Sequence, residues 1–224
     1  MKRTVNRTVL YFLCFSLILS SIILLKVGAY ASPDGEYAES MQRLMDLGIF
    51  SETGPEKMEL DRKITREEFA AVLVRLNGAG DQLSLYRSGS AYSDVDAARW
   101  SNPYIRLAVK NGYMAPMPDG RFHPAEAVSF AQAATVLGRL LKYETSALSG
   151  SYPQNYLTLL DDLEVLDGIS YTADAPVTRG QLSLMLGRLF DAKVYDGEQT
   201  FVETLPNIQE GIVLENSITN PKGD

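Results

Sequence analysis

Two residue types on which metal sites and many catalytic centres depend are nearly absent from this chain. The 224 residues include a single cysteine, Cys14, and a single histidine, His123. A zinc site of the Cys/His type needs three or four such ligands, and hydrolytic dyads pair a nucleophile with a well-placed histidine. The sequence therefore excludes a Cys/His zinc site, and we expect no metal ion, no organic cofactor and no enzymatic activity.

The chain also has fewer basic than acidic residues. Lys and Arg number 21 against 28 Asp and Glu, a formal charge of −7, and no dense basic cluster appears. Binding to nucleic acid needs such a cluster to neutralise phosphates, so we expect no nucleic-acid partner. The 46% hydrophobic and 22% charged content is that of a globular protein and excludes global disorder or a low-complexity fibre.

The first 31 residues have the three-part layout of a secretory signal peptide. A basic start (Lys2, Arg3, Arg7) precedes a 17-residue apolar run, 9–25, and a small-x-small site that ends at Ala31. We expect cleavage after Ala31 and no stable membrane span afterwards; the alternative is an uncleaved anchor. Cleavage removes four basic residues and no acidic one, so the net charge falls from −7 to −11.

Three segments of the chain align without gaps. They begin at Ile64, Val128 and Val177, and each has an apolar β-branched residue, a hydroxyl residue, Glu or Gln three places later, and then an apolar run. This pattern predicts a helix that starts with a capping box. The predicted caps and their partners are Thr65 with Glu68, Ser129 with Gln132, and Thr178 with Gln181.

A second helix is expected upstream of each capped helix. These helices should span about 37–47, from 102 to 111, and 155–166, with Gly48, Gly112 and Gly168 as stop signals. Each repeat is too small to bury its own apolar face, so the three should pack together. The predicted fold class is mainly α.

The second repeat carries the motifs of a known family. It reads Tyr92-Ser93-Asp94-Val95, then Trp100, Tyr104-Ile105, Gly112 and Asp119-Gly120-Arg121-Phe122-His123-Pro124 before its capped helix. This resembles an S-layer homology (SLH) domain. The first and third repeats keep the family's helix start, as Thr65-Arg66-Glu67-Glu68 and Thr178-Arg179-Gly180-Gln181.

The resemblance implies an architecture and a role. It implies three helix-loop-helix modules, at 32–79, 80–144 and 145–194, packed as a pseudo-three-fold trimer within one chain, with a tail at 195–224. It also implies a secreted protein of the cell wall or S-layer of a Gram-positive-type envelope. In the family, grooves between modules bind secondary cell-wall polymers, which are acidic, often pyruvylated glycans linked to peptidoglycan.

The resemblance assigns anion contacts to Arg66 and Arg179, next to the caps Thr65 and Thr178. A guanidinium in the first turn of a helix, beside free backbone N–H groups, suits a carboxylate or phosphate. The alternative for both arginines is that they are solvated or paired with a neighbouring acid.

Two further ligand-binding candidates come from the second repeat. Trp100 would stack on a sugar or, alternatively, anchor the core. Asp94 would orient the groove or bind ligand hydroxyls or, alternatively, stabilise a turn.

Departures from the family pattern limit the expected number of binding sites. Phe130 stands where the second repeat should have the motif arginine, and the other two repeats lack the tryptophan. We therefore expect at most two competent grooves. The later arginines of the capped helices, Arg75, Arg139 and Arg188, are expected to serve packing or helix-end charge.

The leading hypothesis is a non-catalytic protein that anchors itself to secondary cell-wall polymer. The alternative is an envelope protein with degenerate grooves that binds another protein, with short strands at 201–202, 208 and 211–214 of the tail available to a partner. The adjacent acids Asp161-Asp162 and Glu67-Glu68 point in different directions on a helix and do not suit acid/base catalysis.

Overall fold

The computed structural model describes residues 33–51, 58–205 and 208, and these residues belong to one compact unit. The predicted signal peptide lies outside the described residues. The α-helices are α2 (Pro33–Asp46), α3 (Arg66–Leu76), α4 (Asn102–Lys110), α5 (Phe130–Leu140), α6 (Gln154–Asp162) and α7 (Arg179–Leu189), with 3-10 turns η1 (Gly80–Tyr86), η2 (Thr145–Ala147) and η3 (Val202–Thr204). Strand pairing among the described residues is limited to isolated bridges. The prediction of a mainly α fold is confirmed.

The upstream helices stop close to the predicted glycines. Gly48, Gly112 and Gly168 all adopt positive φ, between 66° and 76°. The third helix is shorter than predicted, because α6 ends at Asp162 rather than near residue 166. Glu164 also has a positive φ of 58°, a conformation that a continuous α-helix does not accommodate.

All three predicted capping boxes are present. Thr65, Ser129 and Thr178 have extended backbones, and each side chain accepts a hydrogen bond from the N–H three residues later. The Glu or Gln at that position reaches back to the backbone N–H of the cap. The capping boxes could be predicted from the sequence because their hydrogen bonds join only residues that are close together in the chain.

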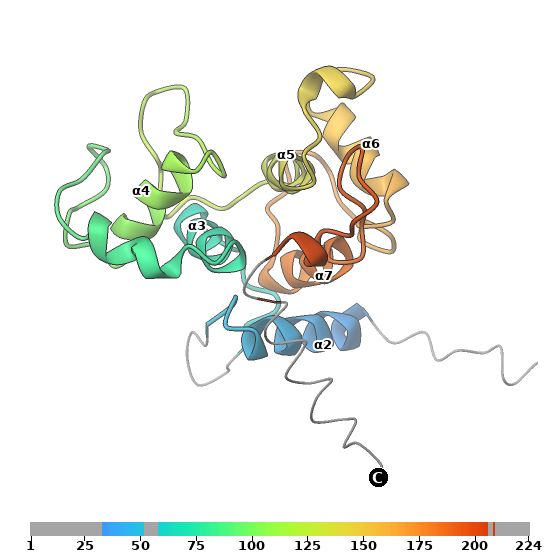
Figure 1. Cartoon of the computed structure of the whole chain (residues 1–224), viewed down its shortest axis with the longest axis horizontal. Helices are drawn as coiled ribbons and strands as arrows, with labels where there is room; N and C mark the ends of the chain where they lie inside the picture. Colours follow the sequence, from blue (N-terminus) through green and yellow to red (C-terminus); the bar gives the residue numbers. More distant parts are fainter. Residues whose placement is uncertain (1–32, 52–57, 206–207, 209–224) are drawn as a thin grey trace, which may run out of the picture. The chain divides into compact units, whose positions relative to one another are not determined.

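The helices pack as three pairs, α3 with α4, α5 with α6, and α7 with α2 (Figure 1). Each capped helix thus contacts the first helix of the next repeat, and the last one returns to the first. The pairs cross the expected module boundaries near residues 79 and 144.

A closed ring of backbone hydrogen bonds joins the three segments that precede the capped helices. The N–H of Ile64 donates to the carbonyl of Val177 at 3.0 Å, Val177 donates to Val128 at 2.8 Å, and Val128 donates to Ile64 at 3.0 Å. Their side chains are at most 1% exposed. The ring therefore lies in the core and ties each repeat to both others.

The first two N–H groups of each capped helix donate to a loop of another repeat. The pairs are Arg66–Glu126 and Glu67–Pro124 for α3, Phe130–Ala175 and Ala131–Ala173 for α5, and Arg179–Arg62 and Gly180–Leu60 for α7, all at 2.8–3.0 Å. The expectation that these N–H groups are free for an anion is wrong. An anion at these helix starts must be held by side chains instead.

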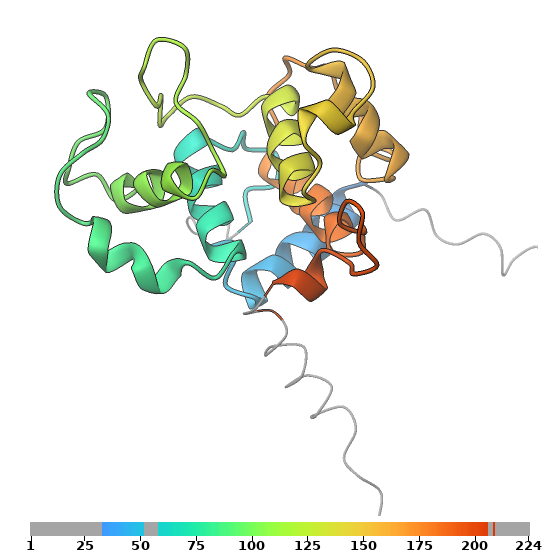
Figure 2. The same cartoon turned by 45° about the horizontal axis from the view of Figure 1, so that its top comes forward.

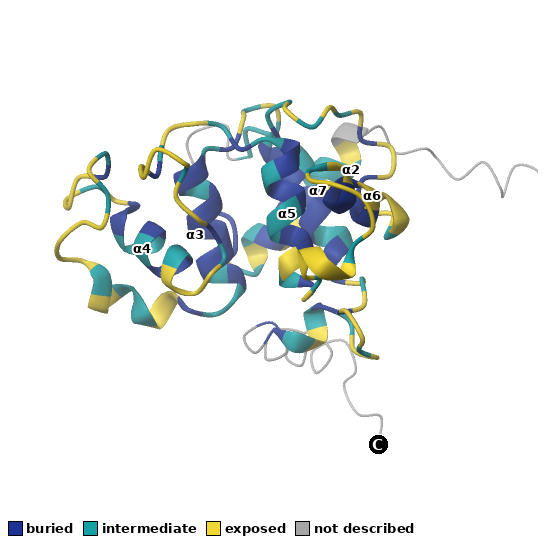
Figure 3. Cartoon of the chain, turned by 90° about the horizontal axis from the view of Figure 1, so that it is seen from above, coloured by how far each residue is buried: buried dark blue, intermediate teal, exposed yellow. Residues whose placement is uncertain are grey.

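The capped helices α3, α5 and α7 are mostly buried, and exposed residues gather on the loops between elements (Figure 3). The described tail packs on this core, since Phe201, Leu205 and Ile208 are at most 4% exposed. It stays beside the C-terminal end of α7, where Val202 N–H donates to the carbonyl of Phe190 (Figure 2). The strand expected at 201–202 is wrong, because η3 forms there; residues 211–214 lie outside the described residues.

Candidate functional site

Among the cavities that border the capped helices, two contain a motif arginine, and we call them grooves A and B. Groove A, of about 240 Å³, is lined by Phe50, Ser51, Glu68, Ala71, Val72, Arg75, Trp100 and Arg179. Groove B, of about 340 Å³, is lined by Arg66, Phe69, 113–118, Val128, Gln132, Thr135, Val136, Arg139 and Tyr152. Residues from all three repeats therefore contribute to the walls.

The two grooves are built on equivalent helix faces. Groove A uses positions 68, 71, 72 and 75 of α3, and groove B uses positions 132, 135, 136 and 139 of α5. This i, i+3, i+4, i+7 spacing places the four side chains on one face of the helix. A motif arginine from another capped helix completes each groove, Arg179 in A and Arg66 in B.

Arg66 is buried and held by backbone oxygens. Its side chain donates from Nε to the carbonyl of Phe122 at 2.7 Å and from Nη2 to the carbonyl of Ala115 at 2.8 Å. The guanidinium also lies over the Phe122 ring, 4.7 Å from its centroid. Burial lowers the pKa of Arg66 from its usual value, but an arginine stays protonated in a protein.

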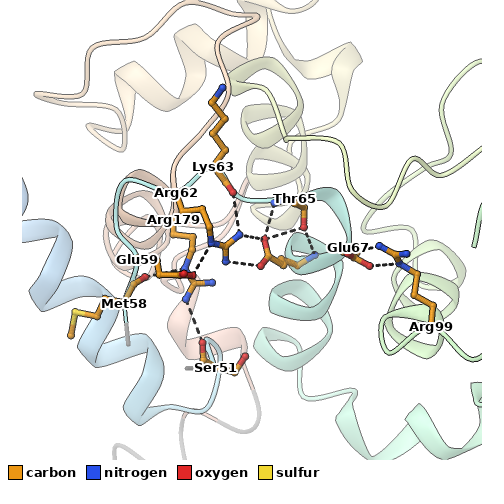
Figure 4. Close-up of polar contacts among 10 residues, drawn as sticks. Ser51, Met58, Glu59, Arg62, Lys63, Thr65, Glu67, Arg99 and Arg179 are labelled. Carbon is orange, nitrogen blue, oxygen red and sulfur yellow. Dashed lines mark hydrogen bonds and ion pairs between the residues drawn. The ribbon is translucent and has the colours of Figure 1, made fainter. Parts of the chain in front are cut away.

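Arg179 has the matching environment in groove A. Nε donates to the carbonyl of Met58 at 3.0 Å and Nη2 to that of Ser51 at 3.3 Å (Figure 4). The residue is 2% exposed, and its guanidinium lies over the ring of Phe50. Within the described part of the chain, neither Arg66 nor Arg179 forms an ion pair with a carboxylate. Both alternatives, solvation and acid pairing, are therefore wrong.

Phe130 replaces the arginine at the third equivalent position. It is buried and stacks on Tyr171 with ring centroids 5.2 Å apart. An aromatic pair thus fills the place where the other two helices put a guanidinium over a ring.

Glu68 in groove A belongs to an ionic network rather than standing alone. Arg62 donates to both of its carboxylate oxygens, at 2.7 and 3.0 Å, and the backbone N–H and hydroxyl of Thr65 donate to Oε2 (Figure 4). Burial disfavours the charged form, but the hydrogen bonds from Arg62 and Thr65 outweigh it and lower the pKa of Glu68. The cap Thr65 is therefore committed to this network, as Thr178 is to its own capping box.

A second ion pair fixes the start of α3 to the segment before α4. Arg99 donates to both oxygens of Glu67, at 2.6 and 2.8 Å (Figure 4). The hydroxyl of Ser101 donates to Glu67 as well. Trp100 lies between Arg99 and Ser101 in the chain. The pair thereby holds the segment that carries the tryptophan at the rim of groove A.

Asp94 lines neither groove. Its carboxylate accepts hydrogen bonds from the backbone N–H groups of Phe122 (3.1 Å) and His123 (2.7 Å). Burial opposes ionisation, but these bonds prevail and lower the pKa of Asp94. The same loop offers the Phe122 carbonyl to Arg66, so Asp94 holds the loop that positions this arginine.

Trp100 is 53% exposed and tilts against Tyr104 with centroids 6.0 Å apart. The core-anchor interpretation of Trp100 is wrong. Tyr152, at 60% exposure, lines groove B and was not predicted. Exposed aromatic side chains at a groove suit the C–H faces of sugars.

Two further groove residues escaped the sequence analysis. Arg75 and Arg139 line grooves A and B, whereas Arg188 at the same helical position donates to the carbonyls of Val165 and Asp167 and pairs with Glu36. Their spacing of seven residues from the capping-box Glu or Gln puts them on the groove face. That spacing was the available signal.

Comparison with known proteins bears directly on this architecture. Residues 91–134, which run from the segment before α4 into α5, match the family described as S-layer homology domain. This part of the chain is therefore similar to an SLH domain. It supplies Trp100 to groove A and positions 113–118, with the start of α5, to groove B.

The similarity to known proteins extends beyond that stretch. The chain is 27% identical to the "Middle cell wall protein" of Brevibacillus brevis over 83% of its length and 29% identical to the "Cell surface protein" of Thermoanaerobacter kivui over 77%. It is 21% identical to the "Cellulosome-anchoring protein" of Acetivibrio thermocellus over 70%. It spans 18%, 23% and 40% of these three proteins.

The described residues lack two kinds of feature, a membrane-spanning helix and a metal-binding cluster. They contain no helix that is both long and apolar enough to cross a membrane. They also contain no group of three or more His, Cys, Asp or Glu side chains placed to hold a metal ion.

Proposed function

We propose that the chain contains three SLH modules, at 32–79, 80–144 and 145–194, arranged with pseudo-three-fold symmetry. The hydrogen-bond ring through Ile64, Val128 and Val177 supports this, because each segment donates to one partner and accepts from the other. The three equivalent helix pairs and the three capping boxes support it as well.

The proposed function is non-catalytic anchoring of a secreted protein at the cell wall of a Gram-positive-type envelope. The ligand would be an acidic secondary wall polymer, and grooves A and B would hold it. The names of the relatives, which refer to cell wall, cell surface and cellulosome anchoring, support this role.

One observation carries the proposal: each groove contains a buried guanidinium that forms no ion pair with any carboxylate of the described residues. Arg66 and Arg179 are 4% and 2% exposed and satisfied only by carbonyls, on Nε and Nη2. A buried charge without a counter-ion is costly, and an anionic ligand at the groove would balance it. The carbonyls and the ring beneath each guanidinium hold it in place before the ligand arrives.

The other candidate residues have supporting roles in this proposal. Trp100 would stack on a sugar ring at the rim of groove A. Thr65 and Thr178 would fix the helix starts that carry the arginines, and Asp94 would hold the loop beneath Arg66.

Co-sedimentation with purified sacculi, before and after extraction of the secondary polymer, tests this function. We expect residues 33–224 to pellet only with polymer-bearing sacculi. Trp100→Ala and the pair Arg66→Met/Arg179→Met should weaken pelleting, while Leu85→Ala, which changes another exposed apolar residue outside both grooves, should not. Folding of each variant is checked by circular dichroism, and absence of pelleting by the folded wild type would contradict the proposal.

The alternative, a protein-interaction role through the tail, receives no support from the described residues. Phe201, Leu205 and Ile208 are committed to the core and are not available as a strand for a partner. The loss of arginine at Phe130 is accommodated by its stacking on Tyr171.

A further inference from the structure

The later arginines of the capped helices divide into two kinds. Arg188 is engaged with two backbone carbonyls and with Glu36, and it lines neither groove. Arg139 is exposed and lines groove B, and its side chain makes no hydrogen bond or ion pair with any other described residue. If these arginines served only to balance the charge at the helix end, Arg139 and Arg188 should have similar surroundings. Their surroundings differ, so another role is needed for Arg139.

Arg75 lies in groove A with its guanidinium over the Tyr104 ring, 5.2 Å from the centroid. Among the described residues, its side chain makes one polar contact, a long one of 3.4 Å from Nη2 to the Tyr104 hydroxyl. The ring holds the guanidinium flat, so its remaining N–H donors stay available at the groove.

The carboxylate in groove A forms its ion pair with a residue outside the groove rather than with either groove arginine. Glu68 is bound through both oxygens to Arg62, which stands outside the set of groove-lining residues. At the equivalent position groove B has the uncharged Gln132, whose amide contacts only the Met117 sulfur at 3.9 Å and the Ser129 backbone. Among the described residues, each groove therefore has two guanidiniums that form no ion pair with an acid.

We propose that Arg75 and Arg139 are anion-binding residues, and that each groove clamps one acidic substituent of a glycan between a buried arginine and this second arginine. The ligand class is a sugar bearing a carboxylate or phosphate, because a fork of N–H donors matches either group. The buried arginine fixes the position of the anion, and the second arginine closes on it from the helix face. This inference rests on the proposed function.

Helix geometry explains why Arg75 and Arg139 reach the grooves. Residues 68 and 75, like 132 and 139, are separated by seven residues and lie on the same face, two turns apart. The arginine therefore lies about 10 Å along the helix from the capping box. That length accommodates roughly one sugar ring between the two ends of the groove.

The test is binding of residues 33–224 to polymer-bearing sacculi at several salt concentrations. The double variant Arg75→Ala/Arg139→Ala should bind at least about tenfold more weakly, and its remaining binding should depend less on salt. Arg188→Ala is the matched control, with the same residue type at the same helical position, and should leave affinity and salt dependence unchanged. Arg75→Lys/Arg139→Lys should restore the salt dependence but not the full affinity, because lysine lacks the planar fork.

The outcomes separate this inference from the proposed function. If the wild type binds and the double variant binds equally well with the same salt dependence, the clamp is refuted and the grooves remain. An equal loss in Arg188→Ala would also refute it, because the effect would then be one of overall charge. If the folded wild type does not bind at all, the proposed function fails and the clamp fails with it.

Discussion

At the scale of single residues, the buried arginines are the feature that sequence reasoning located but could not describe. The motif marked Arg66 and Arg179, yet their carbonyl partners lie between 49 and 128 residues away in the chain. Local patterns carry no information about such partners. The same limit explains why the sequence leaves Trp100 open between stacking on a sugar and anchoring the core, since its exposure depends on how distant segments pack.

Arg66→Met should destabilise the fold. The substitution keeps most of the apolar stem but leaves the carbonyls of Phe122 and Ala115 without donors, which costs about 1–3 kcal/mol. Arg139→Ala, on the exposed face of α5, should change the free energy of unfolding by less than about 0.5 kcal/mol. Urea unfolding followed by circular dichroism measures both; equal stability of the two variants would contradict the structural role of Arg66.

Asp94 makes stability depend on acidity. Because the pKa of its carboxylate is lower in the folded chain than in the unfolded one, its contribution is present above the usual aspartate value of about 4 and is lost as pH falls through the folded pKa. The wild type should therefore lose stability below about pH 4. Asp94→Asn should be less stable at pH 7 and lose less on acidification, as urea midpoints at pH 7 and pH 3 would reveal; parallel losses would count against this account.

At the scale of elements, the capping boxes were predictable because every contact lies within four residues. Replacing a cap removes a hydrogen bond to a helix N–H that has no other partner. Thr178→Ala and Ser129→Ala should each lower the free energy of unfolding by about 1 kcal/mol, and Thr178→Ser should retain most of the stability. Thermal or urea unfolding checks this, and a neutral alanine variant would show that the cap adds nothing.

The packing of α5 on α6 depends on a glycine. A Cβ atom added at Gly138 would stand 2.7 Å from Cδ1 of Tyr156, too close for real atoms, so Gly138→Ala should cost about 1–3 kcal/mol. Gly187 at the corresponding place on α7 meets only the Ser40 side chain, at 3.3 Å. Gly187→Ala is therefore the matched control and should be neutral or slightly stabilising. Equal effects of the two changes would contradict this difference in packing.

At the scale of the whole molecule, the sequence predicted three repeats that pack together but not the order of their contacts. The pairing of α7 with α2 joins elements more than 130 residues apart, and the ring of Ile64, Val128 and Val177 needs all three repeats at once. These contacts arise from burial of apolar faces that no repeat can cover alone.

Removal of the third repeat should therefore unfold the rest. The fragment 33–144 lacks α7, so α2 loses its partner helix and the ring opens at Val177. We expect this fragment to show little cooperative unfolding, whereas residues 33–224 should unfold in one transition seen alike by circular dichroism and tyrosine fluorescence. A cooperatively folded fragment would mean that the repeats are independent domains.

The central claim is that the grooves bind an acidic wall glycan, and the chain offers its own probe of this. Trp100 is the only tryptophan and lies at groove A, half exposed. Titration of residues 33–224 with solubilised secondary wall polymer should shift the emission of Trp100 to shorter wavelength in a saturable manner, and extra salt should reverse the shift. Unchanged emission at polymer concentrations that bind the protein to sacculi would contradict the claim for groove A.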